Sequence, residues 1–179
     1  ERVITGIGDV ARSVDLPVYL SRLRSIDETR SEAGKYYHAI NQGFFADDKD
    51  EMTALMARPE LKDALDGFVF RMTLDMSPWE TASEVHAIAV ELGVQASVHL
   101  RMSGANPAME TADEQSLVNR MAEAMMAAAA FDRVTIYADT LADNDRGYFP
   151  RLGVLDRMFN PRAGCHLVRH MNASLNHAG

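Results

Sequence analysis

Short apolar runs alternate with amphipathic stretches along the chain. Four of these runs have the composition of buried strands: residues 36–42, 67–75, 95–103 and 133–139. The segments between them carry helical patterns, residues 48–58 and the Met- and Ala-rich residues 121–131 among them. This repeated order of strand, helix and strand predicts an α/β fold with parallel strands joined by crossover helices.

Two helix starts and one helix end are marked by capping residues. Ser77-Pro78-Trp79-Glu80 and Thr111-Ala-Asp-Glu114 each place a hydroxyl three residues before a Glu, which predicts two capping boxes. Pro78 suits the first position of a helix, and Gly93 suits a left-handed C-terminal cap. We therefore expect one helix from about Ser77 to Gly93 and another that begins at Thr111.

The start of the chain predicts one more strand, at residues 17–26, after an opening helix over residues 1–14. The total is then about four to five β/α units. The connection over residues 27–35 is short, because a parallel crossover needs a dozen residues or more. Two alternatives follow: a single helical turn joins this strand to residues 36–42, or the two strands are not parallel.

Each of the four main runs carries polar residues on one alternating face. Residues two apart in a strand point the same way, and fully buried parallel strands are usually apolar on both faces. The shared faces comprise His38, Ile40 and Gln42; Arg71, Thr73 and Asp75; His99, Arg101 and Ser103; and Thr135, Tyr137 and Asp139. This parity predicts a polar pocket at the ends of the strands.

The residue types in these faces suit a small polyhydroxylated, acidic molecule. Arg71 and Arg101 offer the forked donors that match a carboxylate. The His, Gln and Asp side chains can hydrogen-bond hydroxyl groups or move protons. The alternative is structural: Arg71 with Asp75, and Arg101 with Asp139, would then be internal ion pairs.

A polar loop follows the last predicted strand and leads into a closing helix. In β/α barrels such loops form the ligand-binding face. Asp143, Asp145 and Arg146 could close over a ligand together with Tyr148 and Phe149. The alternative is a solvated loop in which Arg146 and Arg151 pair with those acids.

Composition excludes several classes of protein. The 179 residues carry a net charge of −8 and one cysteine. This charge argues against nucleic-acid binding, which needs a basic surface, and one cysteine excludes a disulfide framework or a Cys-based zinc cluster. No apolar run approaches the roughly 20 residues that span a bilayer. We expect a soluble, cytoplasmic protein with no cofactor and no resident metal, although His38, His99, Asp75 and Asp139 could ligate one.

The segment Gly153-Val-Leu-Asp-Arg-Met-Phe-Asn-Pro-Arg-Ala163 resembles the closing segment of glycoside-hydrolase-type (β/α)8 barrels. The resemblance implies that residues 1–179 are a single domain and the C-terminal half of such a TIM barrel. The four main runs would be strands five to eight. A complete barrel needs about 250 residues, so the rest would come from missing chain or from a partner subunit. The seventh strand, however, ends without the nucleophile Glu of the retaining glycosidases.

The predicted seventh strand carries Arg and His residues and is followed by Asn106-Pro107. In these features it resembles glycosidase-like barrels of the D-apionate lactonase family. The resemblance implies a hydrolase acting on a small glycoside or aldonolactone. Asp139 or Asp75 would be the general base, His99 or His38 the proton donor, and Arg71 and Arg101 the anion-binding groups. The other substrate-binding residues would be Gln42, Ser103, Tyr137, Asp143, Arg146 and Tyr148. Two alternatives are a non-catalytic carbohydrate-binding or scaffolding barrel and a metal-dependent sugar isomerase or hydrolase.

Overall fold

A computed structural model describes residues 2–22, 43–72, 76–100, 102, 113–138, 140–145, 150–151 and 153–176. These residues form six α-helices, one 3-10 helix and six strands. Their order along the chain is α1 (Arg2–Ser13), β1 (Tyr19–Ser21), η1 (Ala46–Asp48), α3 (Lys49–Met56), α4 (Pro59–Lys62), β2 (Gly67–Met72), α5 (Pro78–Leu92), β3 (Gln95–Leu100), α6 (Glu114–Ala130), β4 (Val134–Ala138), β5 (Asn144–Asp145), β6 (Pro150–Arg151) and α7 (Ala163–Asn176).

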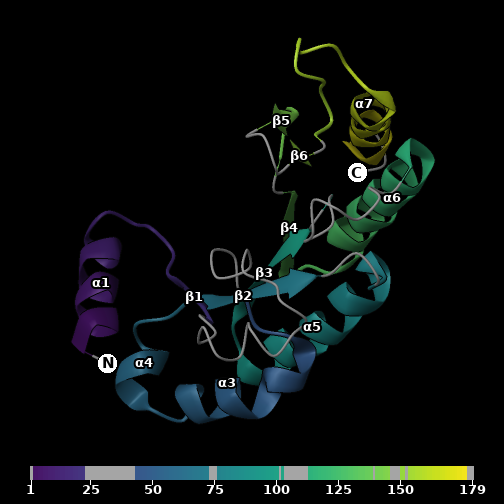
Figure 1. Cartoon of the computed structure of the whole chain (residues 1–179). Helices are drawn as coiled ribbons and strands as arrows, with labels where there is room; N and C mark the ends of the chain where they lie inside the picture. The colour runs from purple at the N-terminus through teal and green to yellow at the C-terminus, as the bar shows by residue number, and fades with distance from the viewer. Residues whose placement is uncertain are drawn as a thin grey trace, which may run out of the picture.

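Strands β1 to β4 form one parallel sheet in the order β1-β2-β3-β4. Helix α5 connects β2 to β3, and α6 connects β3 to β4. The expected α/β fold with a parallel sheet is confirmed. Figure 1 shows α3 and α5 along one side of the strands and α6 beside β4.

Strand β2 has a parallel neighbour on each edge. One neighbour is β3, and the other is β1, which comes from the predicted strand at residues 17–26. Phe44 extends the same edge of β2, through a parallel bridge to Phe70. Residues 36–42 themselves lie outside the described residues. Hydrophobic pattern alone could not find this pairing, because it identifies strands and not their neighbours.

The apolar face of the sheet lies beneath the helices. Phe68, Phe70 and Met72 of β2 alternate with Val69 and Arg71, and only the first three belong to the hydrophobic core. The remaining strands and the helices contribute Ala96, Val98, Leu100, Val134, Ala82, Val85, Ile88 and Ala89. Burying one such large side chain stabilises the fold by about 1.5–3 kcal/mol. The opposite face of the sheet is therefore left for the polar residues.

The caps of α5 agree with the sequence pattern, and that of α6 differs. Ser77 accepts a hydrogen bond from the Glu80 amide, and Gly93 has a φ of 70° at the C-terminal cap. Helix α6 begins at Glu114 with Asp113 as its cap, so the expected start at Thr111 is wrong. The Asp113 carboxylate accepts from both the amide and the hydroxyl of Ser116. These two bonds hold the pKa of Asp113 below its ordinary value of 3.8.

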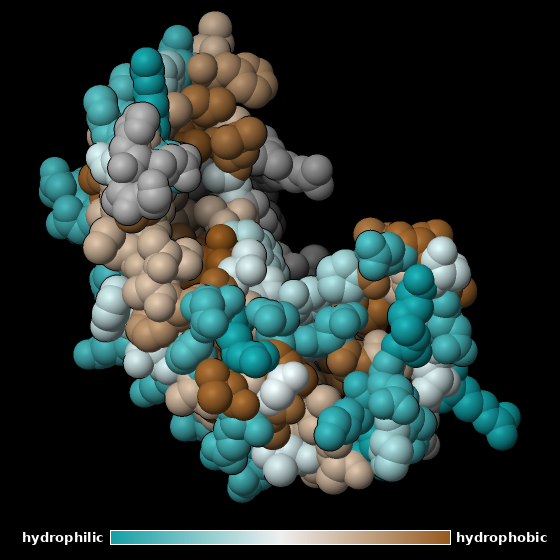
Figure 2. All heavy atoms as spheres, turned by 180° about the vertical axis from the view of Figure 1, so that it is seen from behind, coloured by the Kyte–Doolittle hydropathy of each residue, from teal (hydrophilic) through white to brown (hydrophobic). Residues whose placement is uncertain are grey.

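One face of α1 is apolar and exposed. Val3, Ile7 and Val10 recur at helical spacing along α1, and Val14 follows its last residue; each of the four is more than half exposed. Figure 2 shows a crescent-shaped molecule with apolar atoms at the end formed by α1 and a hollow between its two ends. Within the described residues, no helix is long and apolar enough to cross a membrane.

Glu123 of α6 caps the neighbouring helix α5. Its carboxylate accepts from the Ser77 hydroxyl and, at 3.0 Å, from the Trp79 amide. We expect Glu123→Ala to lower the free energy of unfolding by about 1–2 kcal/mol, because a helix start loses its acceptor. Urea unfolding measures this change. The exposed Glu84→Ala is the control, and an equal loss in both variants would contradict the capping role.

Candidate functional site

A row of polar side chains crosses the sheet on the face opposite the helices. Arg71 of β2 is paired with His99 of β3, and His99 is paired with Tyr137 of β4. Adjacent parallel strands lie about 4.8 Å apart, and paired residues point to the same face. The structure thus brings together three residues that the alternating pattern assigned to one site. They lie toward the carboxyl ends of the strands.

Arg71 is buried and lies over an aromatic ring. It is 7% exposed, and its guanidinium carbon lies 4.6 Å from the centre of the Phe45 ring. An Arg over an aromatic face gains about 0.5–2 kcal/mol from the ring electrons. Sequence reasoning missed Phe45, because its position depends on the bridge that the preceding Phe44 makes to β2.

His99 and Tyr137 stack on each other. Their ring centres are 5.0 Å apart and their planes differ by 12°. His99 is buried, whereas Tyr137, on the last strand of the described sheet, is 41% exposed. Burial raises the pKa of the Tyr137 phenol above its ordinary value of 10.0, so the hydroxyl stays protonated at neutral pH. The row can therefore offer donors of several kinds to one ligand.

Asp143 lies in the segment after β4 and is engaged by the protein. Its carboxylate pairs with Arg162, just before α7, and accepts from the Gly153 amide at 2.8 Å. The expected partners of this acid were Arg146 and Arg151, whose side chains lie outside the described residues, and the described partner is Arg162. Several Arg residues follow Asp143 in the sequence, and the local pattern does not show which of them pairs with it. Binding of substrate by Asp143 stays a prediction.

The other predicted site residues lie outside the described residues. They are the candidate catalytic groups Asp139, Asp75 and His38, and the candidate binding groups Arg101, Gln42, Ser103, Arg146 and Tyr148. Their roles, and the alternative ion pairs of Arg71 with Asp75 and of Arg101 with Asp139, stay predictions. Among the described residues, no three His, Cys, Asp or Glu side chains form a group that could hold a metal ion.

We expect Asp143→Ala to loosen the segment between β4 and α7. The side chain is only 11% exposed, and its loss leaves Arg162 and the Gly153 amide without their acceptor. Hydrogen bonds to charged groups are worth about 1.5–3 kcal/mol. Hydrogen exchange at the amides of Gly153 and Leu155 should become faster. Unchanged exchange there would show that Asp143 does not anchor the segment.

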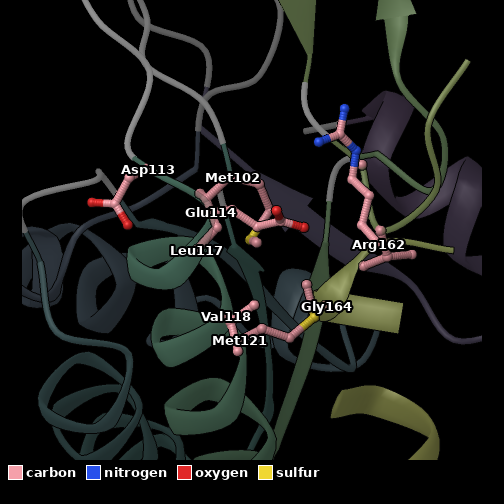
Figure 3. A pocket seen from close by; sticks show the side chains of 10 residues that line it. Met102, Asp113, Glu114, Leu117, Val118, Met121, Arg162 and Gly164 are labelled. Atoms are coloured by element: carbon pink, nitrogen blue, oxygen red, sulfur yellow. The ribbon is translucent and has the colours of Figure 1, made fainter. Parts of the chain in front are cut away.

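A cavity of about 290 Å³ lies near the same end of the sheet. Its wall includes Met102 after β3, residues of the first turns of α6, and Val154 and Gly164 around the start of α7. Figure 3 shows these side chains gathered between α6 and the start of α7. Met102 belongs to the hydrophobic core beneath the helices, so the cavity lies on the other side of the sheet from Arg71 and His99.

Two features of the described residues bear on the function of the protein. The first is the polar row of Arg71, His99 and Tyr137 across three parallel strands. The second is the cavity between α6 and the start of α7. Comparison of the chain with protein-family models, with curated proteins and with solved structures found no match.

Proposed function

We propose that the chain is part of a (β/α)8-type barrel that hydrolyses a small sugar-acid derivative, an aldonolactone or a glycoside. The observation that carries the proposal is the row of Arg71, His99 and Tyr137 toward the carboxyl ends of parallel strands. Active sites of β/α barrels lie at that end. In a closed barrel, the polar face of the sheet would be the interior.

The arrangement of strands and helices supports the barrel. Successive parallel strands have their connecting helices α5 and α6 on one face, as in a barrel wall (Figure 1). Helix α1, which has exposed apolar residues, lies beyond the β1 end of the sheet in Figure 1, and we propose that a further β/α unit packs there. We propose that the remaining units come from the same protein chain or from a partner subunit.

The row has the chemistry to bind an anion beside hydroxyl groups. The guanidinium of Arg71 would hold a carboxylate, or the oxyanion that forms when water attacks an acyl carbon. His99 would give a proton to the leaving oxygen as the ring C–O bond breaks, and Tyr137 would hydrogen-bond a sugar hydroxyl. We keep Asp139 or Asp75 as the proposed general base for water, His38 as the alternative proton donor, and Arg101 as a second anion-binding group.

Isothermal titration with three ligands tests the proposal: D-gluconate, D-glucono-1,5-lactone and methyl glucoside, each with and without EDTA. We expect saturable binding of the acid and the lactone, weaker binding of the neutral glycoside, and no effect of EDTA. A ligand at 100 times its dissociation constant also stabilises the fold by about 2.7 kcal/mol. Binding of the glycoside alone would contradict the sugar-acid site, and loss of binding in EDTA would favour a metal-dependent enzyme.

A further inference from the structure

The cavity between α6 and the start of α7 has a mainly apolar wall. Met102 and Met121 are buried, and Leu117, Val118 and Val154 are partly buried beside them. Met side chains are flexible and polarisable, so they adapt to ligands of differing shape. The wall therefore favours an apolar ligand over a sugar.

The charged residues of the cavity already have partners in the protein. Asp113 accepts from Ser116, Glu114 accepts from the Ala163 amide at 3.1 Å, and Arg162 pairs with Asp143. Figure 3 shows the guanidinium of Arg162 directed away from Val118 and Met121. The buried Nε–H of Arg162 has no acceptor among the described residues, but an anion there would meet the repulsion of Asp113 and Glu114 in the same wall, at a cost in free energy. A neutral ligand has no such cost.

The size of the cavity limits the ligand to one or two rings. An apolar protein cavity of about 150 Å³ takes benzene. The volume here, about 290 Å³, is close to the lower end of ordinary ligand pockets.

We propose that this cavity binds a neutral apolar molecule with one or two aromatic rings, of the size of benzene or indole. The site does not depend on the proposed hydrolase function, because its residues face the helix side of the sheet and Arg71 and His99 face the other side. An experiment can therefore refute the apolar-ligand site or the proposed hydrolase function without refuting the other.

Methionine methyl NMR tests the cavity directly. The protein is labelled with ¹³C at the Met methyl groups, and Met102 and Met121 are assigned through Met→Leu variants. Met52 lies in the core outside the cavity and serves as the internal reference. Titration with indole, and separately with benzene, should shift the Met102 and Met121 signals saturably and leave Met52 unchanged. Signals that stay unshifted at millimolar probe, or that shift equally at Met52, would overturn the proposal.

Gly164 provides a matched pair of variants. A Cβ at this position would be in ordinary contact, 3.5 Å from Val154, so Gly164→Ala should leave most of the cavity open. Gly164→Leu adds a larger side chain to the same wall and should abolish the indole-dependent shifts. Both changes improve helix propensity, which favours folded variants. Equal indole binding by folded Leu and Ala variants would place the ligand elsewhere.

Discussion

Replacing Arg71 by Met is expected to weaken gluconate binding by roughly 10- to 100-fold. Hydrogen bonds to a charged group are worth about 1.5–3 kcal/mol, and each 1.4 kcal/mol corresponds to a tenfold change in affinity. Met keeps an unbranched apolar chain that can still pack on Phe45, so the change removes mainly the charge and the donors. Isothermal titration of the variant with gluconate measures the loss.

The matched control is Arg133→Met at the amino end of the same sheet. Arg133 donates to the Val94 carbonyl at 3.1 Å, just before β3, far along the strands from the row of Arg71. This variant should bind gluconate as the unchanged protein does. If both variants lose affinity equally, the effect reflects net charge. If Arg71→Met binds normally, the assigned site is wrong.

Gly67→Ala is expected to destabilise the fold by about 3 kcal/mol or more, at the upper end for overpacking. A Cβ at Gly67 would lie 2.2 Å from the Gln95 carbonyl oxygen and 2.7 Å from the Tyr19 ring. The Gln95 oxygen belongs to the backbone of β3, and β3 is paired with β2 in the sheet, so this oxygen cannot rotate away. Strands β2 and β3 must then move apart. Urea unfolding gives the free-energy change.

Gly6→Ala in α1 separates this clash from the general effect of removing a glycine. A Cβ at Gly6 meets nothing within 4 Å. The residue lies inside a helix, so Ala should stabilise it by roughly 0.5–1 kcal/mol. A similar loss of stability in both variants would contradict the close approach of β2 and β3.

The sequence predicted those parts of the fold that depend on neighbouring residues. Ser77 and Gly93 cap the two ends of α5 as predicted, because capping is decided within a few positions. At α6, where Thr111 and Asp113 are both capping residue types, the structure uses Asp113 and the prediction chose Thr111. The alternating pattern placed Arg71, His99 and Tyr137 on one face, since strand parity needs no knowledge of partners.

Contacts between distant segments were not predictable in this way. The pairing of β1 with β2 depends on strand order, which local pattern does not record. Phe45 reaches Arg71 only through the bridge of Phe44 to β2, and Arg162 pairs with Asp143 across the segment that leads to α7. Each of these contacts depends on the tertiary arrangement of the chain, which local sequence patterns do not specify.

The rate of lactone hydrolysis tests the central claim most directly. Base consumption during ring opening of D-glucono-1,5-lactone is recorded at constant pH, with the unchanged protein, with His99→Gln and without protein. We predict a rate above the spontaneous one that falls to the spontaneous rate in His99→Gln while gluconate binding persists. A rate equal to the spontaneous one with the unchanged protein, despite saturable gluconate binding, would contradict a hydrolase and leave a sugar-acid-binding barrel.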